Sequence, residues 1–413
     1  MIFSYSNTWN FKSTGMTFPG NAVTSGTVGR DAVVSFKFSS ASAIQVDYGD
    51  GNVVLYNAVS DWVMLRNYYD PNTGTNTATY TYSTGNNSSQ RIVKVKILEP
   101  AKLVEVNLSY VLDLVPQIIP LKFSSVRNLR GIYLAGTKAM GIDESYLQLP
   151  EIVTLSIADG FDVNSRYYGV IPIDVLTGKK YRTFVYSRNN LGNKTFEVSN
   201  LDKIAPLLKN TLLSLGLGNN MLTDANGGLP ANFSELTQLQ SLDLTQNINY
   251  TIIPPVVNTL TSLATLTLTN CIGLTVLSNI DNLVNLVTLS MNNTGKIAPG
   301  FPSGFGNLTR LKTIYFQGCG RNEGLMDEWI SEFYAFYTAH AALTGDNFLP
   351  FRGVKVDVGK IGPTDTLTQI PSGAYQAPAG FVLGVANGSP TSSLEKIYVL
   401  VNQYGHSWTY RTV

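Results

Sequence analysis

The chain has 413 residues and a formal net charge of +1, from 29 basic and 28 acidic side chains, and only 14% of its residues are charged. This balance gives no strong positive field, so we expect neither nucleic acid nor an anionic membrane surface as a partner. Two cysteines and two histidines are too few for a disulfide framework or a zinc site, and no apolar run is long enough for membrane insertion.

Residues 1–29 form no regular pattern of apolar residues. They include the aromatic sequence SYSNTWNFKSTG, from Ser4 to Gly15, and begin without the basic and apolar segments of a secretory signal. We interpret residues 1–29 as an N-terminal arm. Such an arm suits strand addition to a partner protein or insertion into a groove of that partner.

Residues 30–98 alternate apolar and polar side chains in short runs such as VVSFKF and RIVKVKI, separated by Gly-rich and Asn-rich turns. This pattern predicts an antiparallel β-sandwich. The turn in Val46–Gly51, the Tyr-x-Tyr of Tyr80–Tyr82 and the strand Ile92–Ile97 resemble the PKD (polycystic-kidney-disease) domain. The resemblance implies an immunoglobulin-like sandwich over residues 30–98.

A short repeat is the strongest pattern in the chain. The motif L-x-x-L-x-L-x-x-N/C begins at residues 212, 239, 263, 286 and 311, which are 27, 24, 23 and 25 residues apart. The matching residues are Leu212, Leu215, Leu217, Asn220; Leu239, Leu242, Leu244, Asn247; Leu263, Leu266, Leu268, Cys271; Leu286, Leu289, Met291, Thr294; and Leu311, Ile314, Phe316, Cys319. Motif and period resemble leucine-rich repeats, which implies an α/β solenoid with a parallel sheet on its concave side.

Weaker copies of the motif extend the array toward the N-terminus. Their apolar positions are Leu103, Val106, Leu108; Leu129, Ile132, Leu134; Ile152, Leu155, Ile157; and Tyr181, Phe184, Tyr186, the last followed by Asn189. Downstream, the phase of Phe351, Val354, Val356 and Val358 predicts a tenth repeat strand. The solenoid is therefore expected to span residues 101–360, with about ten repeats.

Two further elements are predicted near the C-terminus. Met326–Leu343 places Trp329, Phe333, Phe336, Tyr337 and His340 at helical spacing, which predicts an amphipathic helix over 326–343 on the convex side. Residues 361–413 are expected to cap the solenoid, because an array of stacked repeats needs a closed end. The alternating apolar residues of IYVLVNQYGHSWTYRTV around Asn402–Gly405 predict a β-hairpin in this cap.

Strict alternation along the repeat strands predicts which side chains project from the concave face. These outward residues are Glu105, Asn107, Tyr133, Thr154, Ser156, Thr183, Ser187, Ser241, Asp243, Thr265, Thr267, Thr269, Thr288, Ser290, Asn292, Tyr315, Gln317, Lys355 and Asp357. Small hydroxyl side chains dominate the list. They suit hydrogen bonding to a polar ligand such as a glycan, or they are present because small β-branched residues suit an exposed curved sheet.

Aromatic residues are the other candidates for ligand binding. Loop clusters occur in DWVMLRNYYD and in ADGFDVNSRYYG, where local packing is the alternative interpretation, and the platform itself carries two tyrosines. The candidate ligand-binding residues are Trp62, Tyr68, Tyr69, Tyr133, Tyr167, Tyr168, Arg188 and Tyr315.

The sequence offers little for chemistry. Cys271 and Cys319 occupy the inward Asn position two repeats apart, roughly 10 Å from each other, so we predict two buried free thiols. Asp47 and Asp50 lack the register of a calcium loop and are expected to form a turn. No catalytic or nucleotide-binding motif occurs, so we expect no enzymatic activity, no cofactor and no bound metal.

The combination of modules points to recognition. A PKD-like module before leucine-rich repeats, followed by APAGFVLGVANGSP and EKIYVLVNQYGHSW, resembles surface and phage proteins of gut Bacteroidetes. The resemblance implies a bacteriophage virion protein of the tail-fibre or receptor-binding type that contacts a host cell-surface protein or glycan. The alternatives are a purely structural virion decoration protein, held to other virion proteins through residues 1–30, and a bacterial cell-surface leucine-rich-repeat adhesin. A homo-oligomer is compatible with each of these roles.

Overall fold

The computed structural model describes residues 2–4, 6–7, 34–47, 53–58, 62–66, 77–79, 94–107, 114–115, 118–119, 128–136, 141–142, 149, 151–159, 161, 163–294, 305, 307–317, 325–340, 355–357 and 371–410. The chain divides into two compact units, Met1–Asn189 and Asn190–Val413. We call them the N-terminal unit and the C-terminal unit and describe each by itself.

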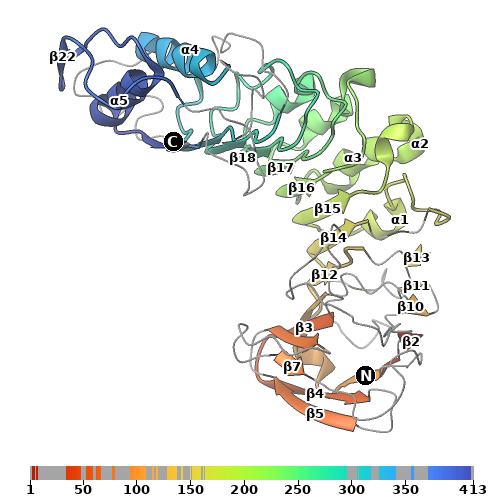
Figure 1. Cartoon of the computed structure of the whole chain (residues 1–413). Helices are drawn as coiled ribbons and strands as arrows, with labels where there is room; N and C mark the ends of the chain where they lie inside the picture. The colour runs from red at the N-terminus through yellow and green to blue at the C-terminus, as the bar shows by residue number, and fades with distance from the viewer. Residues whose placement is uncertain are drawn as a thin grey trace, which may run out of the picture. The chain divides into compact units, whose positions relative to one another are not determined.

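The N-terminal unit contains four parallel repeat strands (Figure 1). They are β9 (Leu103–Asn107), β12 (Gly131–Tyr133), β14 (Thr154–Ala158) and β15 (Thr183–Ser187). Their register places Val106, Ile132, Leu155 and Phe184 side by side, and all four are buried. The weaker upstream repeats are therefore confirmed, apart from Leu108, which lies outside the described residues.

Antiparallel strands precede these repeats. Strand β3 (Val34–Phe38) pairs with β9 on one side and with β6 (Trp62–Arg66) on the other, and β6 pairs in parallel with β7 (Thr77–Thr79). A four-stranded sheet has the order β1 (Ile2–Ser4), β8 (Lys94–Ile97), β4 (Ser42–Asp47) and β5 (Val53–Ala58). Much of residues 30–98 lies outside the described ranges, so the β-sandwich, its PKD likeness and the domain boundaries stay predictions.

The remaining elements of the N-terminal unit are short. They are the pairs β2 (Ser6–Asn7) with β10 (Leu114–Val115) and β11 (Ile118–Ile119) with β13 (Gly141–Ile142), the 3-10 turn η1 (Pro100–Lys102) and the helix α1 (Ile173–Leu176).

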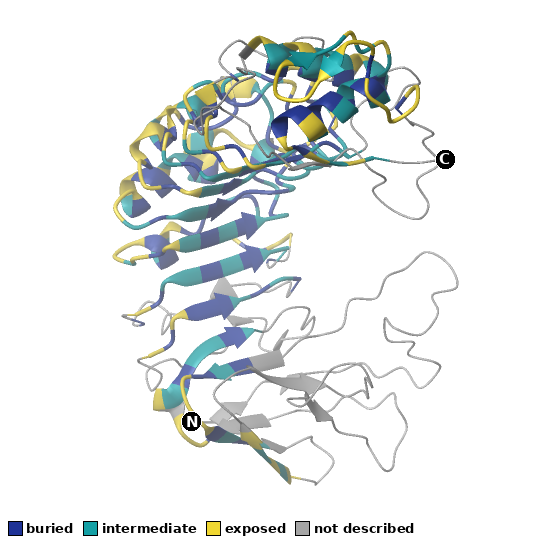
Figure 2. Cartoon of the chain, turned by 90° about the vertical axis from the view of Figure 1, so that its left-hand side faces the viewer, coloured by how far each residue is buried: buried dark blue, intermediate teal, exposed yellow. Residues whose placement is uncertain are grey.

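The C-terminal unit continues the same architecture with six parallel repeat strands. They are β16 (Ser214–Gly216), β17 (Ser241–Asp243), β18 (Thr265–Thr267), β19 (Thr288–Ser290), β20 (Thr313–Tyr315) and β21 (Lys355–Asp357). The central residues Leu215, Leu242, Leu266, Leu289 and Ile314 are in register and buried. Figure 2 shows buried residues (dark blue) next to half-buried residues (teal) along the repeat strands. The repeat starts at 212, 239, 263, 286 and 311 and the predicted tenth strand are confirmed.

Short helical turns occupy the return paths that lead into β16, β17 and β18. They are η4 (Leu191–Asn193), α2 (Phe196–Ser199), η5 (Leu201–Lys203), α3 (Ile204–Leu208), η6 (Ala225–Gly227), η7 (Ala231–Glu235) and η8 (Pro255–Thr259). The leucines of strands and turns meet in one elongated core, where each fully buried aliphatic side chain contributes about 1.5–3 kcal/mol.

Buried asparagines join successive repeats at the inward motif position. Asn247 donates from Nδ2 to the carbonyls of Leu217 (3.1 Å) and Leu244 (2.8 Å). Its Oδ1 accepts from the backbone N–H groups of Asn220 (3.0 Å) and Leu222 (3.1 Å). One amide side chain thus satisfies four backbone groups from two repeats, which explains why Asn is favoured at this motif position.

The residue before this inward position has a left-handed backbone in repeat after repeat. In the C-terminal unit these residues are Asn219, Gln246, Asn270 and Asn293, with φ between 54° and 61°. Each donates its N–H to a carbonyl of the next repeat, at 2.6 to 2.8 Å. Most residues other than Gly and Asn tolerate this region poorly. We call these four residues the left-handed row.

The C-terminal end differs from prediction. The segment predicted as a β-hairpin forms helix α5 (Ser393–Tyr404), and β24 (Ser407–Thr409) then pairs in parallel with β21. The hairpin prediction is wrong because Ser392 and Glu395 form a capping box, and Gly405, at φ 71°, ends the helix. These local signals override the alternation of apolar residues. A smaller hairpin, β22 (Phe381–Val382) with β23 (Ala386–Asn387), lies earlier in the tail.

The predicted long helix is confirmed as α4 (Leu325–His340). Phe333 and Tyr337 are buried. The Phe333 ring contacts His406 and Trp408. The Tyr337 ring contacts Tyr404 and His406. The side chains of Trp329 and His340 lie outside the described residues. Helices α4 and α5 therefore cover the last repeats together.

Candidate ligand-recognition face

The outward residues of β16 to β20 form two columns across five neighbouring strands. The first column consists of Ser214, Ser241, Thr265, Thr288 and Thr313, and the second of Gly216, Asp243, Thr267, Ser290 and Tyr315. Adjacent strands lie about 4.8 Å apart, so the first column presents five hydroxyl groups at regular intervals. We call these two columns the hydroxyl face.

The position of each hydroxyl follows from its buried neighbour. Because side chains alternate along a strand, burying Leu266 between Thr265 and Thr267 leaves both threonines on the opposite side. Both are half-buried, as are the other outward residues of these strands apart from the buried Gly216. The predicted outward positions in β17 to β20 are thus confirmed, and those of Lys355 and Asp357 are outside the described side chains.

The hydroxyl face is close to neutral. Asp243 is its one charged residue among β16 to β20, and its Oδ1 accepts the backbone N–H of Thr245 at 2.8 Å. Next to the columns, the Thr269 and Ser290 hydroxyls lie 3.0 Å apart, and Asn292 Oδ1 accepts the N–H of Gln317 at 2.9 Å. The surface can therefore donate and accept neutral hydrogen bonds along its length.

Tyr133, in the N-terminal unit, belongs to a network of hydrogen bonds with Glu105 and Lys37. Its hydroxyl donates to Glu105 Oε2 at 2.9 Å, and Lys37 Nζ lies 3.0 Å from Glu105 Oε1. Burial, and then the bond to Glu105, raise the pKa of Tyr133 to about 12. A Cβ at Gly131 would lie 3.1 Å from Glu105 Cγ, so a larger residue there would require the Glu105 side chain to shift.

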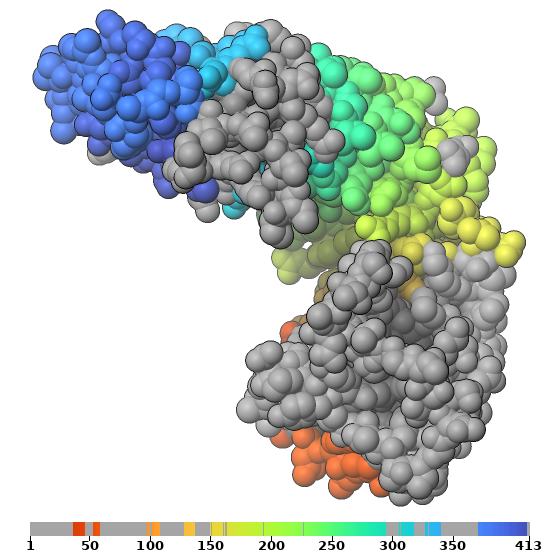
Figure 3. All heavy atoms as spheres, in the orientation of Figure 1, coloured from red at the N-terminus to blue at the C-terminus, as the bar shows by residue number. Residues whose placement is uncertain are grey.

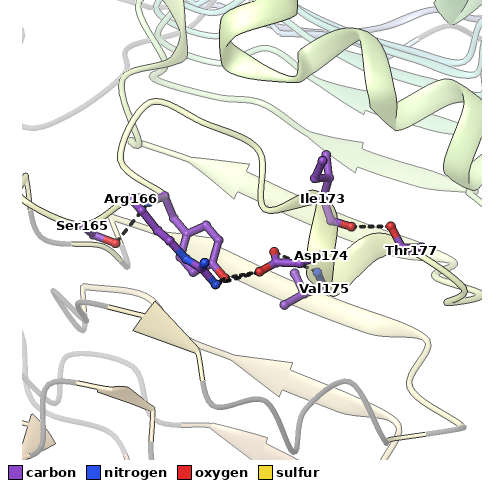
Figure 4. A network of polar contacts seen from close by, with 7 residues as sticks. Ser165, Arg166, Ile173, Asp174, Val175 and Thr177 are labelled. Carbon is purple, nitrogen blue, oxygen red and sulfur yellow. Dashed lines mark hydrogen bonds and ion pairs between the residues drawn. The ribbon is translucent and has the colours of Figure 1, made fainter.

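Tyr167 is buried, and its hydroxyl forms hydrogen bonds within its own loop (Figure 4). Its hydroxyl donates to Asp174, which also binds Arg166 at 2.9 Å, and the Arg166 guanidinium lies 4.6 Å from the Tyr167 ring centre. Burial, and then the bond to Asp174, raise the pKa of Tyr167 to about 12. With Phe161 at 5.0 Å from its ring, Tyr167 holds the loop together and presents little surface to a ligand.

Smaller hydrogen bonds fix the same loop. Figure 4 shows Ser165 Oγ accepting the backbone N–H of Tyr167 at 3.2 Å, and the Thr177 hydroxyl donating to the Ile173 carbonyl at 2.7 Å. Asp174 could not be identified from the sequence as a partner of Tyr167, because the intervening residues form an irregular loop without a period. Tyr167 therefore packs within its own loop, and its role in ligand binding stays a prediction.

The other predicted site residues are divided between the two units. Tyr168 and Arg188 are half-buried in the N-terminal unit, where Arg188 has a left-handed backbone with φ 58°. Tyr315, also half-buried, ends the second column of the hydroxyl face. Trp62 lies in β6 with its side chain outside the description, and Tyr68 and Tyr69 are outside the described residues.

Cys271 is a free, buried thiol, as predicted. Its Sγ donates to the Leu244 carbonyl at 3.3 Å, and burial raises its pKa to about 12. Cys319 lies outside the described residues. Across the described part of the chain no three His, Cys, Asp or Glu side chains gather in a group that could hold a metal ion. Among the described helices, none has the length and apolarity to cross a membrane.

The chain is similar to several solved structures of known proteins. No protein-family model and no curated protein matches the chain. Similar solved structures include a leucine-rich-repeat protein of Leptospira interrogans, 21% identical over 53% of this chain and 50% of that chain, with a TM-score of 0.36. An internalin of Listeria monocytogenes is 16% identical over 51% of this chain and 60% of its own, with a TM-score of 0.34.

A third similar structure is the leucine-rich-repeat ectodomain of an Arabidopsis thaliana membrane receptor kinase in complex with Casparian strip integrity factor 2. It is 16% identical over 48% of this chain and 26% of that chain, with a TM-score of 0.28. The chain spans between half and three fifths of the first two structures. Ten parallel repeat strands among the described residues, with their central apolar side chains buried, give the chain the fold of a leucine-rich-repeat solenoid.

Proposed function

We propose that the protein is a non-enzymatic recognition protein that binds a polar ligand on the hydroxyl face. The supporting observation is the register of hydroxyl groups across β16 to β20. A hydroxyl both donates and accepts a hydrogen bond, so a row of them matches ligands with hydroxyl and amide groups. A cell-surface glycan or a polar protein surface has this chemistry.

The charges of the face favour binding over catalysis. Hydrolysis of glycosidic bonds ordinarily needs two carboxyl groups about 5 to 9 Å apart. Asp243 is alone among the outward residues of β16 to β20, and one of its oxygens is engaged by Thr245. Tyr315 supplies the one aromatic ring on the same face, suitable for stacking against a sugar or an apolar side chain.

We also propose the finer organisation and role implied by the resemblance. Residues 1–29 would be an arm, 30–98 a PKD-like β-sandwich, 101–360 the solenoid and 361–413 the cap. The protein would serve a bacteriophage particle as a tail-fibre or receptor-binding component on the host cell surface. Mass spectrometry of purified particles tests this location. Absence from particles, with presence on bacterial cells, would favour the cell-surface adhesin instead.

Binding by the hydroxyl face can be tested with two matched arginine variants in one repeat. Thr267→Arg places a bulky cation in the middle of the face, whereas Thr275→Arg places it on an exposed loop outside the strand. The full chain would be applied to glycan arrays and to intact candidate host cells. We expect Thr267→Arg to weaken binding at least about tenfold and Thr275→Arg to leave it unchanged.

The binding should also depend little on salt, because the face carries one carboxylate and no described cation. Equal binding by both variants would exclude the hydroxyl face as the contact. Binding that collapses at high salt would show that a charged surface elsewhere is responsible.

A further inference from the structure

The last described segment, residues 371–410, has an unusually neutral composition. Its charged side chains are Glu395 and Lys396, which are adjacent in α5. Glu395 accepts the N–H groups of Thr391 (2.7 Å) and Ser392 (3.2 Å), and Lys396 donates to the Ser331 hydroxyl at 2.8 Å. Both charged side chains therefore form hydrogen bonds within the C-terminal unit. We call residues 371–410 the end module, and Figure 3 shows it as one continuous blue surface.

Three aliphatic side chains project from the end module into solvent. Val382, Leu383 and Val385 are 51%, 66% and 67% exposed, and all lie in the hairpin formed by β22 and β23. Figure 1 places β22 at the outer end of the C-terminal unit. We call these three residues the hairpin tip. Leaving three large aliphatic side chains together in water costs free energy that burial in an interface recovers.

The hairpin is held in this position by α5. The Gly384 N–H donates to Gln403 Oε1 at 2.7 Å, and Asn387 Nδ2 donates to the Tyr404 hydroxyl at 2.9 Å. The Phe381 ring lies 5.5 Å from the Tyr398 ring. A turn supported at three points cannot fold its aliphatic residues inward without breaking these contacts. The tip is thus pre-organised, which lowers the entropic cost of binding.

The neutral surroundings favour a particular partner. In a twofold contact between identical chains, each residue near the axis meets its own copy, so any charge there would repel itself. The run from residue 366 to residue 394, which contains the hairpin tip, has no charged side chain. A partner selected by charge would instead require a charged patch. Surfaces with little net charge also tend to associate with each other.

We propose that the hairpin tip is a self-association surface at which a second copy of this chain binds by a twofold contact. Val382, Leu383 and Val385 form its apolar centre, and the uncharged Asn387 lies in the same hairpin. A centre of three side chains is small beside stable interfaces, so the dimer is weak and concentration-dependent. Its function is to join two recognition faces, which increases binding to a multivalent surface.

The test compares two aspartate variants of the full chain by sedimentation velocity over a wide concentration range. Leu383→Asp puts a charge on the contact axis, and Val163→Asp is the matched control, because Val163 is 64% exposed in the N-terminal unit. We expect the wild type and Val163→Asp to dimerise as concentration rises. Leu383→Asp should weaken the dimer at least about tenfold while circular dichroism and thermal midpoint stay unchanged.

A second measurement locates the contact. With Leu383→Cys, oxidation should produce a disulfide-linked dimer, because equivalent residues near a twofold axis approach each other. Val163→Cys should not. A wild type that stays monomeric at the highest soluble concentration overturns the proposal, and so does a dimer equally stable in Leu383→Asp. Capture of a different protein by a tip that never self-associates would also reject the second copy as its partner.

Discussion

Replacing Asn247 by alanine tests the role of the inward asparagines directly. Asn247 is fully buried, and its amide binds two backbone N–H groups and two carbonyls. In Asn247→Ala the N–H groups of Asn220 and Leu222 lose this acceptor. A buried backbone group deprived of its partner costs about 1–3 kcal/mol. Both carbonyls accept further bonds, from Asn220 Nδ2 and from Cys271 Sγ, so their loss adds less.

We therefore expect Asn247→Ala to lower the free energy of unfolding by about 3 kcal/mol, a large part of the stability of an ordinary domain. Equilibrium urea unfolding followed by far-ultraviolet circular dichroism measures this loss as a shift of the midpoint by up to about 1 M, because m is about 3 kcal/mol/M or more for a large chain. Asn249→Ala is the control, because Asn249 is an exposed residue of the same loop, and its replacement should change stability by less than about 0.5 kcal/mol. Equal, small shifts in the two variants would refute the structural role assigned to the amide.

Two further predictions concern ionisable groups. In a Cys319→Ser background, Cys271 should resist thiol reagents in native buffer and react only after unfolding, because its pKa of about 12 keeps the buried thiol protonated; rapid native reaction would contradict this. The pKa of Glu395 is lowered to about 2, first by the Thr391 N–H and hydroxyl. A carboxyl with a lower pKa in the folded state stabilises it above the unfolded value of about 4.5 and loses that contribution as pH falls toward 2. Thermal melts over that range should therefore fall more steeply for the wild type than for Glu395→Gln, and parallel curves would show that the capping carboxylate does not contribute.

The repeats could be predicted because each depends on local spacing alone. One repeat buries Leu263, Leu266 and Leu268 against equivalent residues of its neighbours. The motif residues therefore make the contact between neighbouring repeats. The same alternation correctly placed Thr265 and Thr267 outward. The C-terminal helix was missed because IYVLVNQY fits both a period of two and a helical period. The capping pair Ser392 and Glu395 was the signal that would have decided between them.

The polar networks could not be predicted from spacing. Glu105 lies opposite Gly131 on the neighbouring strand, and its carboxylate extends past that glycine to Tyr133, two residues farther along β12. The bond between Tyr167 and Asp174 depends on a loop whose path has no period. The exposed hairpin tip follows from two turns at Gly380 and Gly384, whose φ values of 77° and 76° a sequence pattern does not reveal.

The left-handed row limits how this surface can be re-engineered. Asn219, Gln246, Asn270 and Asn293 take their backbone shape from the turn that leads each coil into the next. A valine or isoleucine there would strain every turn it entered, so β-branched side chains are disfavoured along that edge. The neighbouring strand positions carry no such restriction. Diversified libraries aimed at new ligands should therefore randomise 241, 265, 267, 288 and 290 and leave the bordering amides fixed.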